Sequence, residues 1–258
     1  MRPPYPGEGS AGPREPAAAP ERSWERWERV PEEPEERPAA RNEPRGRTEE
    51  PVLPEEVQSE LASSGGRRAP GYTRKLSAAT RSYERERYED ARRILAELVR
   101  ELPDAASVRE LYGLTLYRMG RWKQAATQLR AFWELTGSYD QYPVMADCER
   151  AMGHHGAVQS LVEELRSASA GSDLTSEGRL VLAGSLADQG LIPEAIRLLE
   201  PHAKALRHPA ERHLRTWYAL ADLYERAGEL PRARALFAQV ASQDPSLGDS
   251  KRRSDALG

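Results

Sequence analysis

The sequence has little cysteine, few aromatic residues and no long apolar run. Its single cysteine, Cys148, excludes an internal disulfide and a cysteine metal cage. The longest uninterrupted apolar runs are only a few residues, far below the ~20 that a membrane-spanning helix needs. The first residues also lack the apolar core of a signal peptide. We therefore expect no membrane partner and a cytoplasmic location.

Lysine is scarce as well, so arginine dominates the basic residues, and the formal net charge is only -3. Acidic residues outnumber basic ones within residues 1–70, and no basic stripe recurs along the chain. A nucleic-acid-binding repeat protein needs such a stripe to contact the phosphates. RNA or DNA association is therefore disfavoured and is kept only as an alternative.

Sequence signatures of catalysis are also missing. There is no Gly-x-Ser-x-Gly elbow and no phosphate-binding glycine loop. His154 and His155 are adjacent, but no Cys, Asp or Glu follows them at ligand spacing, so we predict no metal site. Cys148 is interpreted as a small core residue. These observations predict a protein that is not an enzyme and has no cofactor.

What the sequence does contain is an internal repeat. Leu111 to Ala125 indicate one helix, a turn at Gly120 and the start of a second helix. Ala91 precedes Ala125 by 34 residues in the same pattern, and this period is typical of helical hairpin repeats. With the turn alanine numbered as position 20, five units cover residues 72–245.

Small residues recur in these units where two antiparallel helices would cross. A bulkier side chain there is expected to cost about 1–3 kcal/mol through overpacking. The third unit, which begins at Tyr139, fits the register least well. In the fourth unit, Pro201 is expected to kink or end the second helix. The small residues at position 8 are Ala79, Gly113, Ala146, Ala183 and Ala221.

The fifth unit is the most complete. Its pattern consists of Trp217, Leu220, Ala221, Tyr224, Gly228, Ala233, Phe237 and Pro245. Residues 72–245 resemble the tetratricopeptide repeat (TPR) family, and the whole chain is similar to actinobacterial TPR proteins with a Pro/Arg/Glu-rich leader. The resemblance implies an all-α, right-handed α-solenoid of about five antiparallel helix-turn-helix repeats, whose first helices line a concave groove.

The segments that flank the repeats differ in composition. Residues 1–50 are rich in Pro, Glu and Arg, and we predict a disordered leader because they cannot bury enough apolar surface to offset ordering. Within them, Trp24 and Trp27 stand at i, i+3 and form a candidate linear motif that folds on a partner or on the repeats. The alternative is a chance occurrence in an Arg/Glu-rich tail.

Residues 51–64 carry Leu53, Val57 and Leu61 at intervals of four, which predicts a short docking or capping helix. Residues 65–71 are predicted to be a linker because they begin with a glycine pair. The polar residues 246–258 are predicted to be a disordered tail.

In the TPR family, positions 2, 5, 9, 12 and 13 of the first helix face the groove. Position 5 lacks the lysine and asparagine of members that clamp a chaperone tail. The resemblance predicts a scaffold or adaptor that binds a peptide or a partner helix. Alternatively, the candidate arginines and aspartates only solvate the surface and the tyrosines pack on the next hairpin, or the solenoid self-associates. The candidate groove residues are Tyr83, Glu110, Leu114, Tyr117, Arg118, Asp147, Arg150, Tyr218, Asp222 and Arg226.

Overall fold

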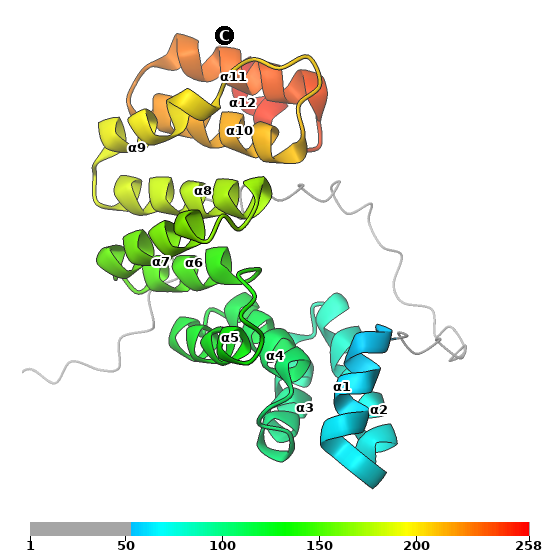
Figure 1. Ribbon diagram of the computed structural model, residues 1–258. Helices are drawn as coiled ribbons and strands as arrows, with labels where there is room; N and C mark the ends of the chain where they lie inside the picture. The colour runs from blue at the N-terminus through cyan, green and yellow to red at the C-terminus, as the bar shows by residue number, and fades with distance from the viewer. Residues whose placement is uncertain (1–52, 258) are drawn as a thin grey trace, which may run out of the picture.

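The computed structural model describes residues 53–257, and within that range every regular element is a helix (Figure 1). The predicted leader and the candidate motif at Trp24 and Trp27 lie outside the described residues. The elements are α1 (Glu55–Gly65), the 3-10 helix η2 (Gly66–Arg68), α2 (Ala69–Glu84), α3 (Tyr88–Glu101), α4 (Ala106–Arg118), α5 (Trp122–Thr136), α6 (Tyr142–Ala151), α7 (His155–Ser167), α8 (Ser172–Asp188), α9 (Ile192–Leu199), the 3-10 helix η3 (Glu200–His202), α10 (Glu211–Arg226), α11 (Leu230–Gln243) and α12 (Ser250–Ala256).

These helices form five antiparallel hairpins: α2/α3, α4/α5, α6/α7, α8/α9 and α10/α11. The hairpins follow one another in chain order from α1 and α2 at one end of the molecule to α12 at the other (Figure 1). Each hairpin packs on the next, so the buried core runs along the stack rather than around one centre. The fold class predicted from the sequence, an all-α solenoid of about five hairpins, is confirmed.

The hairpin turns share one backbone motif. In the second hairpin Gly120 has φ +71°, and the Arg121 N–H donates to the Leu116 carbonyl at 2.9 Å. This six-to-one bond across a left-handed residue is the Schellman motif, which satisfies carbonyls at a helix C-terminus. The first hairpin has the same bond but places Glu86 at φ +57°, where the other four have glycine.

The small residues at position 8 pack where the two helices of a hairpin cross. A Cβ atom built on Gly113 would lie only 2.6 Å from Leu129 Cγ on the partner helix α5. Ala79, Ala146 and Ala221 are at most 1% exposed. The backbones of the two helices can therefore approach closely at the crossing only because these residues are small, as the repeat register predicts.

Helix α1 packs on the first two hairpins. Leu61 is fully buried there, and Leu53 is 6% exposed. The Glu60 carboxylate accepts hydrogen bonds from the backbone N–H groups of Ala106 and Ser107, at the start of α4. Because Ala105 at the N-cap of α4 has no side-chain acceptor, Glu60 supplies the cap from another helix.

The predicted linker at residues 65–71 is wrong in the structure. Helix α1 ends at Gly65, η2 follows directly, and α2 begins at Ala69. Pro70 lies in the first turn of α2, where its missing N–H has no intrahelical acceptor, so it starts the helix instead of breaking it. The Gly65 backbone packs close to the Tyr72 ring.

The tail predicted to be disordered from residue 246 instead folds back as α12. Leu247 is 3% exposed and Arg253 pairs with Asp222 of α10, so contacts distant in sequence hold a segment of polar composition. The prediction for Pro201 is confirmed, because α9 ends at Leu199 and η3 carries the chain past the proline.

Candidate partner-binding groove

The first helices of the second to fifth hairpins line a cavity of about 650 Å³, which we call the central groove. Tyr117 comes from α4, and the other lining residues come from α6, α8, α10 and the segments just before them. Its apolar lining consists of Pro143, Val144, Leu174, Leu180 and Val181. Its charged lining consists of Asp140, Asp147, Asp173, Glu177, Glu211, Arg212 and Arg215.

Several of these residues stand at the groove positions of the repeat but are not among the sequence candidates. Pro143 and Leu180 occupy position 5 of the third and fourth units, while Glu177 and Arg215 occupy position 2 of the fourth and fifth. Their positions in the repeat were therefore enough to predict that these residues line the groove. Leu174 precedes the fourth unit, since α8 begins at Ser172, and the register does not predict it.

Two sequence candidates, Tyr117 and Asp147, lie together at the bottom of the central groove. The Tyr117 hydroxyl donates to Asp147 Oδ2 at 2.9 Å, and Arg150 Nη1 donates to Asp147 Oδ1 at 2.9 Å. Arg150 Nε also donates to Asp188 Oδ2 at 2.6 Å, and its guanidinium lies against Gly184 of α8. This network joins three successive hairpins and fixes the groove wall.

The charges of the groove are mostly paired, with an acidic excess. Arg212 pairs with Asp173 at 2.8 Å, and Arg215 lies 3.1 Å from Glu177 and 3.0 Å from Glu211. Burial raises the pKa of Glu177, which indicates that its carboxylate lies in a poorly hydrated part of the wall. Five carboxylates against two arginines give the lining a net negative charge.

Apart from Tyr117, the candidates of the first two units lie beside the central groove rather than in it. Tyr83 stacks edge-on with Tyr88, at 5.6 Å between ring centroids, and Arg118 lies over Tyr88 at 5.4 Å. Glu110 accepts a hydrogen bond from Gln141 Nε2 at 2.8 Å, and burial raises its pKa. Leu114 is half-buried on the same helix.

The candidates of the fifth unit contact neighbouring parts of the chain. The Tyr218 hydroxyl donates to Asp249 Oδ1 at 2.6 Å, just before α12, and Arg253 of α12 donates to Asp222 Oδ1 at 2.9 Å. Arg226 donates to the Ala187 carbonyl of α8 at 3.1 Å. At this end, α12 covers the positions that elsewhere face the groove.

The geometry of stacked hairpins agrees with the comparison to known families. A tetratricopeptide repeat family model matches residues 76–134 and 180–247. These two segments are similar to the tetratricopeptide repeat. The TPR segments found in this way include the first helices that line both ends of the central groove.

The TPR fold is also seen in a crystal structure of a thermophilic TPR protein from Thermus thermophilus. It aligns with a TM-score of 0.53 and 18% identity, over 72% of this chain and 98% of that chain. None of the curated proteins matches this sequence. TPR domains generally mediate contacts between proteins.

Two further features of the part of the chain in the structure bear on function. None of its helices is both long and apolar enough to cross a membrane. His154 contacts Glu149 Oε2 at 2.8 Å and His155 contacts Ser185 Oγ at 2.8 Å, so the two imidazoles have different partners. Within residues 53–257, no three His, Cys, Asp or Glu side chains are grouped closely enough to hold a metal ion.

Proposed function

We propose that this protein is a non-catalytic scaffold or adaptor whose central groove binds a peptide or helix of a protein partner. The observation that carries the proposal is the cavity of about 650 Å³ on the first helices, because it combines apolar side chains with an acidic excess. Its volume lies in the range of about 300–1,000 Å³ that is usual for ligand sites.

The chemistry of the groove favours one kind of occupant. Pro143, Val144 and Leu174 are half-buried and offer apolar contacts to an inserted side chain. Around them, Glu211 and Asp173 are exposed, so lysine or arginine next to the inserted residue finds a carboxylate. The occupant is a segment with one or two large apolar side chains flanked by basic residues.

Selection of random peptides on the immobilised full-length chain tests the proposal. We expect enrichment of peptides that pair a large apolar residue with lysine or arginine. The double variant Leu174→Ser, Glu211→Lys should bind these peptides about 10-fold more weakly or worse, since it removes an apolar contact and reverses a rim charge.

The matched control is Leu135→Ser, Glu194→Lys, which makes the same changes outside the groove, at the exposed Leu135 of α5 and the partly exposed Glu194 of α9. Its affinity should equal that of the unchanged chain. Peptides that bind both double variants equally well, or a selection without any consensus, would remove the groove from consideration.

A further inference from the structure

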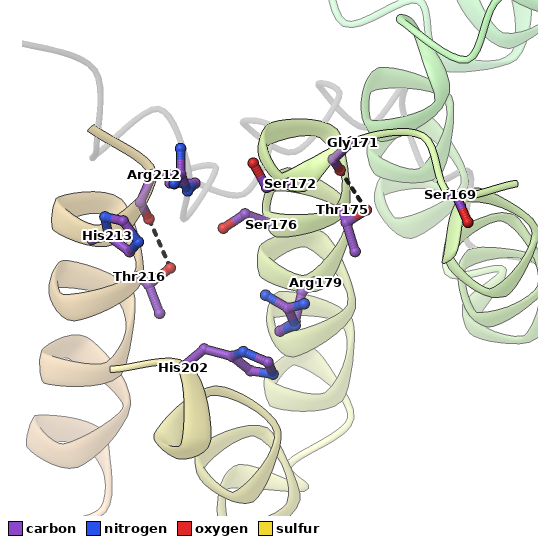
Figure 2. A pocket seen from close by; sticks show the side chains of 10 residues that line it. All are labelled: Ser169, Gly171, Ser172, Thr175, Ser176, Arg179, His202, Arg212, His213 and Thr216. Atoms are coloured by element: carbon purple, nitrogen blue, oxygen red, sulfur yellow. Dashed lines mark hydrogen bonds between the residues drawn. The ribbon is translucent and has the colours of Figure 1, made fainter. Parts of the chain in front are cut away.

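A second cavity of about 410 Å³ lies between α8, η3 and α10 (Figure 2). We call it the polar cavity. Its lining carries hydroxyl, guanidinium and imidazole groups, and the described residues that line it include no carboxylate. This composition is the opposite of the acidic groove. The lining residues are Ser169, Gly171, Ser172, Thr175, Ser176, Arg179, His202, Arg212, His213 and Thr216.

Ser176 presents its hydroxyl to this cavity. The residue is 5% exposed, and its hydroxyl points from α8 toward α10, into the cavity (Figure 2). Among the described residues it makes no hydrogen bond. Its neighbours differ, because Thr175 donates to the Gly171 carbonyl at 2.7 Å and Thr216 donates to the Arg212 carbonyl at 2.8 Å. The Ser176 hydroxyl therefore faces the cavity without an acceptor from the described part of the chain and can donate to a ligand there.

Arg179 lies on α8 close to Ser176 and turns its guanidinium toward the same cavity (Figure 2). It is half-buried and has no carboxylate partner within the described part of the chain. Arg215 on the facing helix, in contrast, contacts two carboxylates. A guanidinium remains charged at neutral pH, so Arg179 places an uncompensated positive charge in the cavity.

Other groups around the polar cavity add to the positive charge of Arg179. Arg212 faces the cavity from α10, although it also pairs with Asp173. The pKa of His202 is lowered by burial and further by the charges of Arg179 and Lys204, as expected in an electropositive site. Ser172 begins α8, whose N-terminal turn adds partial positive charge at the rim.

We propose that the polar cavity binds a phosphate group. A phosphate presents several acceptor oxygens. These can accept hydrogen bonds from the Ser176 hydroxyl and from the guanidinium groups of Arg179 and Arg212, which come from two different helices. A single carboxylate would leave more of these donors without an acceptor. Phosphate binding here requires no occupant in the central groove, although Arg212 lines both cavities.

Calorimetric titration of the full-length chain with inorganic phosphate tests this site. We expect saturable binding at millimolar phosphate or below, and a melting temperature that rises with phosphate because only the folded chain binds it. Ser176→Ala and Arg179→Gln should each weaken phosphate binding about 10-fold, the usual size for a lost hydrogen bond to a charged group.

Arg234→Gln is the matched control, since it removes one exposed guanidinium on α11 and should leave phosphate binding unchanged. Melting curves without phosphate show whether each variant is folded. Phosphoserine and adenosine monophosphate, titrated in parallel, distinguish a phosphate carried by a protein from one carried by a nucleotide. Absence of saturable phosphate binding, or equal binding by Ser176→Ala, Arg179→Gln and Arg234→Gln, would overturn the proposal whatever the groove binds.

Discussion

Position 9 of the repeat has different surroundings in the third and fifth hairpins. Asp147 and Asp222 occupy this position, and both carboxylates are buried against an arginine. In the third hairpin the partner is Arg150 of the same helix, and the adjacent groove stays open. In the fifth hairpin the partner is Arg253 of α12, which covers the surface. The same position therefore borders either an open groove or a surface that α12 covers, depending on which element supplies the arginine.

The two arginines also differ in how they are held. Arg150 is enclosed between successive hairpins, and its side chain is 10% exposed. Arg253 is 12% exposed, but it belongs to a seven-residue helix near the end of the chain and lies over the Phe237 ring at 4.2 Å. A terminal helix can detach and admit water, whereas an internal hairpin cannot do so without breaking the stack.

The largest expected effect is that of Arg150→Ala. Removal of this guanidinium leaves Asp147 buried without its cation, and breaking a buried ion pair in this way costs about 3–5 kcal/mol. Urea unfolding followed by circular dichroism measures the change. Arg166→Ala, which breaks an exposed pair with Glu163, should cost less than about 1 kcal/mol. Equal losses in the two variants would show that the buried network does not stabilise the stack.

A smaller loss of about 1–3 kcal/mol is expected for Arg253→Ala, in the range for hydrogen bonds to charged groups and for an unsatisfied buried group. Detachment of α12 would let water reach Asp222 and limit the cost. Amide hydrogen exchange should accelerate in α12 but not in α6. A loss as large as that of Arg150→Ala, with unchanged exchange in α12, would contradict the difference between the third and fifth hairpins.

The smallest effect is expected for Tyr218→Phe, which removes the hydrogen bond to Asp249 and should cost about 0.5–1.5 kcal/mol at neutral pH. Burial and this hydrogen bond raise the pKa of Tyr218 to about 12, from an ordinary value of 10.0. The folded chain thus keeps a proton that the unfolded chain releases. The Tyr218 contribution is fully present below pH 10 and is lost as the pH rises toward about 12.

Unfolding curves between neutral pH and pH 12 measure this dependence, since the free energy of unfolding should fall less steeply in Tyr218→Phe than in the unchanged chain. An identical slope in both proteins would exclude Tyr218 as a source of the alkaline loss.

The hairpins could be predicted from the sequence because their determinants are local. Gly113 and Ala125 stand in one unit, and the turn glycine between them fixes where its two helices meet. Helix α12 could not be predicted in the same way. Its composition is polar, and its position depends on Arg253 reaching Asp222 and Glu225, about thirty residues earlier in the chain.

The groove residues that stand at repeat positions could be predicted from the sequence, but those outside the repeat units could not. Tyr117 and Asp147 follow from the repeat positions, as do Glu177 and Leu180 of the fourth unit once the same rule is applied. Leu174 lies in the groove because α8 starts before the repeat register does. The hydroxyl that Ser176 presents to the polar cavity has no sequence signal, since only the packed structure shows which serines face a cavity.

The Glu60 cap links two helices that are not consecutive in the chain. Because the carboxylate on α1 reaches the start of α4, it spans the α2/α3 hairpin that lies between them in the chain. Opening that hairpin without losing this bond would require α1 and α4 to keep their places while the segment between them unfolds. We therefore expect residues 55–118 to unfold together and the opposite end of the solenoid to fray from α12 inward.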